Sequence, residues 1–334
     1  MRVNFRDPRL WLLTASVALL MATFAMPQAS VARASYDILA IVDITGSMNV
    51  RDYTASGRPV SRLDTVKAAL RHMATKLPCS SRVGLGVFTE RRPFLLFEPI
   101  GVCADFSPLE AAIAALDWRM AWDGDSRVST GLYRAIEMAR ELKADLLFFT
   151  DGHEAPPLPA SGAQTFDGRP GETRGLIVGV GGYDLSPIPK FDDRGRDIGF
   201  VGIDDVPHES RFGLPPKGAE QREGFNARNA PFGATAAVGV EHLSSVKEDY
   251  LLTLSEKTGL NYAHLDDGAR LLEAYLGTAT GRMRESRFDL RPILGAAAAA
   301  MLFSAFAAAP LFARLSRALN TSTFNVRLQS GRKQ

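Results

Sequence analysis

The sequence predicts an α/β fold: a doubly wound, mostly parallel sheet with helices on both faces and one antiparallel hairpin. Three observations predict it. Short apolar runs alternate with segments of helical spacing, as in chains that build parallel sheets. The run 38–42 is apolar without interruption, which is typical of a strand buried on both faces. Polar loops follow the runs 38–42 and 146–149, and open α/β sheets carry their sites at such strand ends.

The first half of the predicted sheet begins with a strand over 36–42. A helix is predicted over 62–77, where apolar residues recur at helical spacing: Leu63, Val66, Leu70, Met73 and Leu77. Strands over 83–89 and 94–98 are predicted to form the antiparallel hairpin. A helix over 108–118 follows, with Pro108 in its first turn.

The second half alternates in the same way. The predicted elements are a helix over 129–142, strands over 146–150 and 176–180, a helix over 244–258, a strand over 261–265 and a helix over 268–276. Gly259 is a plausible C-terminal stop for the helix before it. The segments 154–172 and 183–240 are rich in Pro and Gly and are predicted to be long loops, the second an insertion that is either a partner-binding arm or a decorated loop.

The first 34 residues read as a signal peptide. Basic residues (Arg2, Arg6, Arg9) precede an apolar stretch over 10–26, and Ala32-Arg33-Ala34 supplies a cleavage pattern. Cleavage after Ala34 is the favoured interpretation, and an uncleaved anchor is the alternative.

The other end of the chain predicts a membrane anchor. Residues 292–313 form a charge-free apolar segment of about 22 residues, long enough for a transmembrane helix; a buried core helix is the alternative. The basic tail 314–334 carries no acid, which favours a cytoplasmic side for it. We therefore expect an inner-membrane protein whose soluble domain, 35–281, lies in the periplasm.

The net charge of +2 conceals a division along the chain. Residues 35–281 carry a net charge of −8, which argues against nucleic acid as a partner and is compatible with a cation or a basic protein. The two cysteines, Cys79 and Cys103, flank the predicted hairpin at its open end, so a disulfide is predicted. Two buried free thiols are the alternative.

Three loops supply candidate metal ligands at one edge of the sheet. The first contributes Asp43, Thr45 and Ser47, the second (123–127) contributes Ser126, and the third contributes Asp151. Carboxylate and hydroxyl oxygens suit Mg²⁺, Mn²⁺ or Ca²⁺ and not Zn²⁺. The alternative is a capped helix start and an ordinary turn. His153 and Glu154 beside the third loop are the one candidate acid–base pair, and a purely structural role is favoured for them.

These residues resemble the metal-ion-dependent adhesion site of the von Willebrand factor type A domain family, Asp-x-Ser-x-Ser followed by a Thr and an Asp. Asp43, Thr45, Ser47 and Asp151 match that pattern, with Thr in the second position. Counting back from Gly131 places Ser126 in the Thr position, and Ser129 or Thr130 takes it if that register is wrong. The resemblance implies the doubly wound fold and a metal-mediated contact with a protein partner.

A narrower resemblance is to the MxaL-type accessory proteins encoded with bacterial methanol dehydrogenase. The segments that carry it are 88–92, 116–122 and 150–157. It implies a role in maturation of that enzyme, including insertion of its Ca²⁺.

Three functions follow as hypotheses. The favoured one is a non-enzymatic, membrane-anchored protein that binds a partner through a divalent metal, with methanol dehydrogenase or an assembly factor as the candidate partner. The second is a calcium chaperone that carries Ca²⁺ itself. The third is an aspartyl-phosphate phosphotransferase with Asp43 as nucleophile, which the absence of a P-loop motif disfavours.

Overall fold

The computed structural model describes residues 7–25, 28–120, 125–158, 163–192, 194–206, 218, 221 and 239–308. The chain divides into two compact units, one formed by residues 33–284 and the other by residues 1–32 with 285–334.

The larger unit is built on a six-stranded sheet with the strand order β13-β8-β7-β2-β5-β6. All neighbouring strands run parallel except β5 and β6, which form an antiparallel hairpin. The predicted mostly parallel sheet with one hairpin is therefore confirmed. The strands are β2 (Asp37–Asp43), β5 (Arg82–Thr89), β6 (Arg92–Gly101), β7 (Asp145–Thr150), β8 (Gly175–Gly179) and β13 (Asn261–His264).

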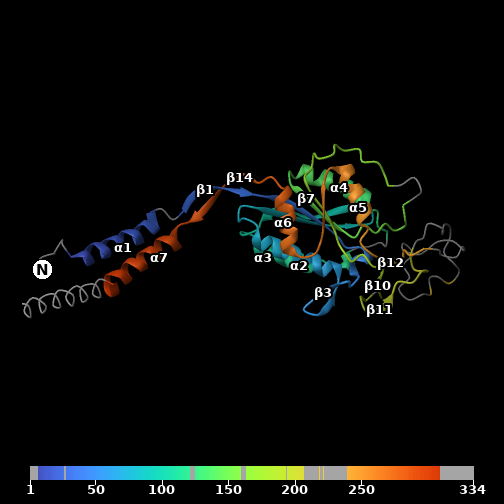
Figure 1. The fold of residues 1–334 in the computed structure, drawn as a ribbon, viewed down its shortest axis with the longest axis horizontal. Helices are drawn as coiled ribbons and strands as arrows, with labels where there is room; N and C mark the ends of the chain where they lie inside the picture. Colours follow the sequence, from blue (N-terminus) through green and yellow to red (C-terminus); the bar gives the residue numbers. More distant parts are fainter. Residues whose placement is uncertain are drawn as a thin grey trace, which may run out of the picture. The chain divides into compact units, whose positions relative to one another are not determined.

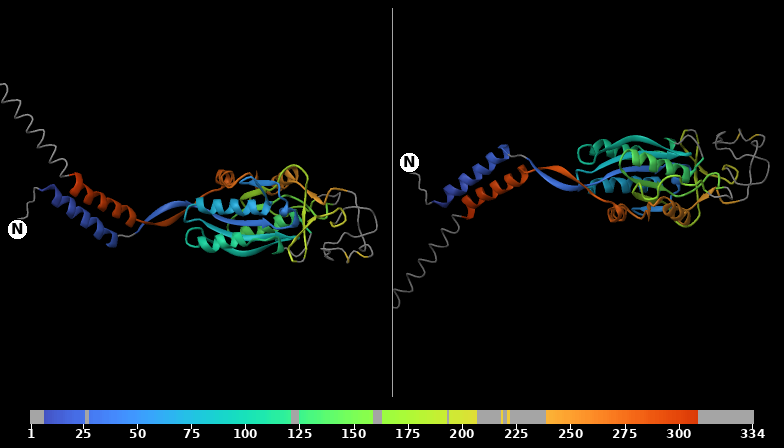
Figure 2. Two further views of the ribbon diagram at one scale, coloured as in Figure 1. Left: turned by 90° about the horizontal axis from the view of Figure 1, so that it is seen from below. Right: turned by 90° about the horizontal axis from the view of Figure 1, so that it is seen from above.

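Helices cover both faces of this sheet (Figures 1 and 2). One face packs against α2 (Arg62–Lys76), α3 (Phe106–Ala115) and α6 (Gly268–Thr278), and the other packs against α4 (Val128–Glu141) and α5 (Glu248–Thr258). Every residue of β2 is buried, and its side chains alternate between the two layers. The sequence signal of a continuous apolar run thus corresponds to the central strand of a three-layer unit.

Two predicted helices have different boundaries in the structure. The helix predicted over 244–258 begins only at Glu248, because Ser244 belongs to the short strand β12 (Leu243–Ser244), which pairs with β9 (Ser186–Pro187). Its predicted stop is confirmed, since Gly259 caps α5 with a left-handed φ of 74°. The helix predicted over 108–118 is α3, which starts two residues earlier and ends at Ala115.

The structure adds short elements in the loops. A hairpin of β3 (Tyr53–Ala55) and β4 (Arg58–Val60) follows the 3₁₀ turn η1 (Gly46–Asn49). Within the predicted insertion 183–240, β10 (Pro189–Phe191) pairs with β11 (Asp197–Phe200), and most of the remainder lies outside the described residues. Trp118, in η2 (Trp118–Met120), stacks on Phe191 of β10 with ring centroids 4.6 Å apart. Trp122 lies outside the described residues.

The predicted disulfide is confirmed. Cys79 and Cys103 are bonded, with their Cα atoms 5.0 Å apart. Since the two residues bracket β5 and β6, the bond closes the open end of the hairpin.

The smaller unit contains α1 (Pro8–Ala25), which packs against α7 (Arg291–Phe303) and the π-helical turn η4 (Ser304–Ala308). The buried Ser16 hydroxyl donates to the carbonyl oxygen of Ala298 at 3.1 Å. Strands β1 (Gln28–Ser35) and β14 (Arg282–Asp289) form a two-stranded sheet.

None of the helices in the described part of the chain is long and apolar enough to cross a membrane. The transmembrane helix predicted over 292–313 is therefore not supported, and residues 309–313 lie outside the described residues, as does the basic tail 314–334.

Candidate metal site

The strand order places a topological switch point at the carboxyl end of the central strand, β2. From β2 the chain continues to β5 on one side, and it later returns to β7 on the other side, so the connections diverge at the carboxyl end of β2. Asp43 is the last residue of β2, and Asp151 follows the last residue of β7. Val42 pairs with Phe149, so the two carboxylates lie at the same edge of the sheet.

The first loop turns back onto its own carboxylate. Asp43 Oδ1 accepts hydrogen bonds from the backbone N–H of Thr45 (2.9 Å) and from its hydroxyl (2.7 Å). The hydroxyls of Thr45 and Ser47 lie 3.5 Å apart. On the other side, Thr150 Oγ1 donates to Asp43 Oδ2 at 2.7 Å, which joins the first loop to β7. The structure thus brings Asp43, Thr45 and Ser47 together, all of them buried.

The third loop brings Asp151 to the same place. Its Oδ1 accepts from the backbone N–H of His153 (3.0 Å), and the Ser47 hydroxyl also bonds to this carboxylate. Its Oδ2 accepts from Arg62 Nη1 (2.7 Å) and from the Ser244 hydroxyl (2.8 Å). Asp151 is fully buried, so each of these donors compensates for lost water.

The described part of the second loop, 125–127, lies beside the end of β5. Ser126 bridges Glu90, just after β5, and Ala155, just after the third loop. Its side chain is buried, and its hydroxyl has no hydrogen-bond partner among the described residues. It is one of eight buried side-chain nitrogen or oxygen atoms without a partner among the described residues, and its place in the second loop leaves it available to a ligand.

The alternative residues for the second-loop position point elsewhere. Thr130 Oγ1 hydrogen-bonds to Gln164 in an exposed position, and the Ser129 hydroxyl bonds to Tyr250. The register used in the sequence count also agrees with the packing: a Cβ on Gly131 would overlap the Phe88 ring, so only glycine lets α4 lie this close to β5.

Burial and neighbouring charges shift the pKa values of Asp43 and Asp151 in opposite directions. Burial, followed by the negative charge of Asp151, raises the pKa of Asp43 to about 7. Burial alone would also raise the pKa of Asp151, but the adjacent Arg62 guanidinium and His153 hold that pKa below its ordinary value. The pKa of His153 is itself lowered by burial. Asp43 is therefore the carboxyl that most needs a cation to ionise near neutral pH.

His153 and Glu154 do not form a pair in the structure. Glu154 Oε1 accepts from the Tyr250 hydroxyl (2.6 Å) and from the backbone N–H of Ser129 (3.1 Å) at the start of α4. This carboxylate caps α4 and fixes the third loop to it, which agrees with the structural role favoured from the sequence.

Sequence reasoning missed Arg62, Asp52, Thr89 and Ser244. The signal for Arg62 was present, because it lies on the apolar face of its helix, four residues before Val66 and seven before Ala69. Thr89, at the end of β5, carries a second buried hydroxyl without a partner among the described residues.

Comparison with known families identifies the unit that carries this site. Residues 38–153 match the family described as von Willebrand factor type A domain. Over these residues the chain is similar to a von Willebrand factor type A domain. The match extends from β2 to the third loop and includes every candidate ligand of the type A domain site.

Solved structures with a similar fold have low sequence identity to this chain. An aerotolerance-related membrane protein from Bacteroides fragilis NCTC 9343, with multiple mutations to serines, is 14% identical over 73% of this chain and 98% of that chain, with a TM-score of 0.43. The conserved hypothetical protein BatB from Bacteroides thetaiotaomicron is 14% identical over 72% and 94%, with a TM-score of 0.42. The PilB minor pilin from Streptococcus sanguinis is 14% identical over 73% and 60%, with a TM-score of 0.33. No curated protein matches the sequence.

The type A domain site fits a hard divalent cation by its donor chemistry. It combines two carboxylates with hydroxyl groups, one of which, Ser126 Oγ, is buried and unpartnered among the described residues. Within the same described residues, no group of three or more His, Cys, Asp or Glu side chains is placed to hold a metal. A cation here would therefore be held by few acidic groups and keep open coordination positions.

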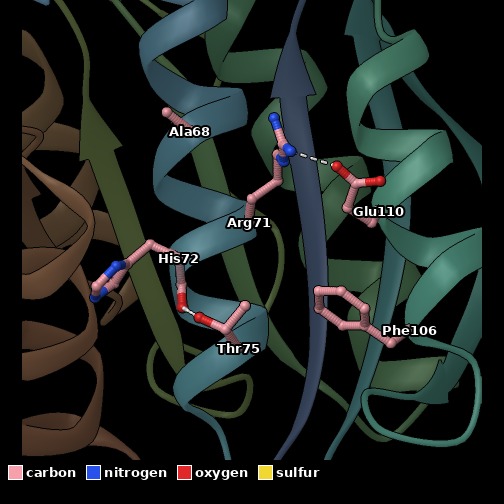
Figure 3. A pocket seen from close by; sticks show the side chains of 6 residues that line it. All are labelled: Ala68, Arg71, His72, Thr75, Phe106 and Glu110. Carbon is pink, nitrogen blue, oxygen red and sulfur yellow. Dashed lines mark hydrogen bonds and ion pairs between the residues drawn. The ribbon is translucent and has the colours of Figure 1, made fainter.

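A separate hollow lies between α2 and α3 (Figure 3). Arg71 and Glu110 form an ion pair across it at 2.5 Å, and His72, Thr75 and Phe106 also line it. The lining residues come from the later turns of α2 and from α3, and none of them is a candidate metal ligand.

Proposed function

We propose that this chain is a binding protein, not an enzyme, and that its type A domain contacts a protein partner through a divalent cation, with Mg²⁺ the first candidate and Mn²⁺ or Ca²⁺ the others. The observation that carries the proposal is the buried hydroxyl of Ser126, which has no partner among the described residues and lies beside the edge where Asp43 and Asp151 meet. Asp43, Thr45, Ser47, Ser126 and Asp151 would hold the ion.

The composition of the site supports adhesion over ion delivery. Two carboxylates, one already paired with Arg62, are few for tight Ca²⁺ binding, for which proteins use several acidic ligands. An ion bound by mostly neutral oxygens retains positive charge, and a carboxylate from a partner would complete its coordination.

Binding of Mn²⁺ to the purified full chain in detergent tests the ion site. We expect Ser126→Ala to weaken binding by at least about tenfold, the lower end for groups that support a metal site. Thr130→Ala is the matched control, because it removes an exposed hydroxyl from the same helix start. Equal affinities of wild type and Ser126→Ala would remove this hydroxyl from the site.

We further propose that the partner belongs to the maturation machinery of methanol dehydrogenase, including insertion of its Ca²⁺. The support is the resemblance of the segments 88–92, 116–122 and 150–157 to MxaL-type proteins. Glu90 and Ala155, which belong to two of these segments, form backbone bridges with Ser126 in the structure. Affinity capture from host membranes in Mg²⁺, Ca²⁺ and EDTA, with wild type and Asp43→Ala, is the test. Dehydrogenase or assembly factors captured only with metal and Asp43 would support the proposal, whereas capture that is indifferent to both would contradict it.

We also propose that the terminal segments anchor the protein in the inner membrane, with the type A domain in the periplasm. The support is the charge-free segment 292–313 followed by the basic tail 314–334. Extraction of host membranes with alkaline carbonate is the test, and release of the protein into the soluble fraction would contradict the anchor.

A further inference from the structure

Arg62 places a full positive charge inside the candidate metal site. Its side chain is completely buried, and its Nη1 donates to Asp151 Oδ2 and to the Ser244 hydroxyl, both at 2.7 Å. The same nitrogen lies 3.4 Å from the carbonyl oxygen of Ser47. Two of the candidate ligand residues thus contact one guanidinium.

The helix itself does not explain a positive charge at this position. Arg62 is the first residue of α2, where the helix macrodipole disfavours positive charge. The local helix start is already satisfied, because the Ser61 hydroxyl accepts from the backbone N–H of Asp64 at 3.0 Å. The position of the Arg62 guanidinium is therefore explained by the carboxylates that it pairs with, not by the helix start.

A second carboxylate holds Arg62 independently of Asp151. Asp52 Oδ2 accepts from Arg62 Nε (2.9 Å) and Nη2 (2.7 Å), and it also accepts from the backbone N–H of Gly182 at 2.7 Å. A Cβ on Gly181 would lie 2.5 Å from Arg62 Nε, so the guanidinium lies directly against the backbone after β8. Arg62 therefore stays in place whether or not Asp151 turns toward an ion.

We propose that Arg62 tunes the ion site: its charge balances Asp151, lowers the affinity of the site for a divalent cation, and so makes stable occupancy depend on a carboxylate supplied by the partner. This inference rests on the proposed metal-dependent function. Arg62 is a positioning and charge-balancing residue, not a ligand, because it carries no acceptor. Asp52 has the opposite effect, since it offsets part of the charge of Arg62.

The test measures Mn²⁺ affinity by electron paramagnetic resonance on the purified full chain in detergent at pH 8, without a partner. We expect Arg62→Gln to bind Mn²⁺ about tenfold more tightly, because it removes a unit positive charge that lies 2.7 Å from the carboxylate of Asp151, a candidate ligand. Arg62→Lys keeps the charge and should stay within about threefold of wild type. Asp52→Asn leaves Arg62 less neutralised and should bind about threefold to tenfold more weakly.

Arg51→Gln is the matched control, because it removes the same charge from a half-exposed position in the loop between η1 and β3, where Arg51 pairs with Asp197. Its affinity should equal that of wild type. Equal or weaker binding by a folded Arg62→Gln protein would overturn the inference and leave the metal site intact. Absence of Mn²⁺ binding in wild type and all variants would overturn both. If Arg62→Gln does not fold, Asp52→Asn decides: weaker binding supports the inference, and unchanged binding overturns it.

Discussion

Asp37, the first residue of β2, is hydrogen-bonded to three arginines, so its replacement tests how much these ion pairs stabilise the larger unit. Its side chain is 1% exposed and accepts hydrogen bonds from Arg82 (2.9 and 3.2 Å) and Arg284 (2.9 and 2.7 Å), with Arg282 at 3.3 Å. Burial alone would raise the pKa of Asp37, but Arg82 and Arg284 hold it below its ordinary value. We expect Asp37→Asn to destabilise the fold at neutral pH.

The magnitude follows from what the substitution leaves behind. Breaking a buried ion pair costs about 3–5 kcal/mol. The three arginine side chains are 34–48% exposed, so water recovers part of their solvation and the loss should be about 3 kcal/mol. For a unit of this size, that lowers the Tm by about 6–10 °C. Glu172→Gln, which removes an exposed ion pair with Arg140, is the control and should change stability by less than about 1 kcal/mol.

The pH dependence of this difference is the sharper observable. Because the folded-state pKa of Asp37 is depressed, its stabilisation is present above the unfolded value of about 4 and is lost as the pH falls through the folded value. Thermal unfolding of wild type and Asp37→Asn, followed by circular dichroism from pH 7 to pH 3, should show a gap that closes at the acidic end. A gap of constant size across this range would refute the reasoning, as would no gap at pH 7.

Three further outcomes test the site and its support. Because burial and Asp151 raise the pKa of Asp43 to about 7, protons should compete with the ion, and Mn²⁺ affinity should fall by roughly tenfold from pH 8 to pH 6; a flat profile in titration calorimetry would contradict this. Gly131→Ala should cost about 1–3 kcal/mol in urea unfolding, since its Cβ would overlap Phe88. Phe88→Leu should recover part of that loss, and strictly additive effects would count against the contact. Replacing both Cys79 and Cys103 by Ser should cost about 3 kcal/mol, and an unchanged unfolding midpoint would show that the hairpin does not need the bond.

The parts of the fold that were predicted well are those specified by local pattern. The run 38–42 and the helical spacing after Arg62 predicted β2 and α2 nearly to the residue. A strand buried on both faces is a continuous apolar run, whereas a helix buried on one face has apolar residues every three to four positions. The start of α5 was predicted four residues too early, because the polar side chain of Ser244 is engaged by Arg62 from a distant part of the chain. A contact between residues so far apart in the sequence cannot be predicted from local periodicity.

In the candidate site, too, the residues of one loop were predictable from spacing, whereas those brought together by tertiary packing were not. Asp43, Thr45 and Ser47 share one loop, so their proximity is readable from spacing alone. Which hydroxyl of the second loop joins them depends on how α4 packs on Phe88, a tertiary contact that spacing could only suggest through Gly131. Ser126 as a metal ligand remains a prediction, although the structure supplies its burial and its lack of a partner among the described residues.

The terminal segments suggest a test of the two interpretations of processing. The sequence favours removal of residues 1–34, but in the structure α1 packs on α7, and Ser16 and Ala298 are both buried where they bond. Cleavage after Ala34 would expose that surface of α7 and leave β14 without β1. Retention of the segment, the alternative to the favoured cleavage, predicts the full mass of 36.2 kDa for the protein isolated from host membranes. A mass that lacks residues 1–34 would contradict the pairing of these helices in the mature protein. Retention does not alter the proposed topology, because Arg2, Arg6 and Arg9 and the basic tail would then lie on the same cytoplasmic side.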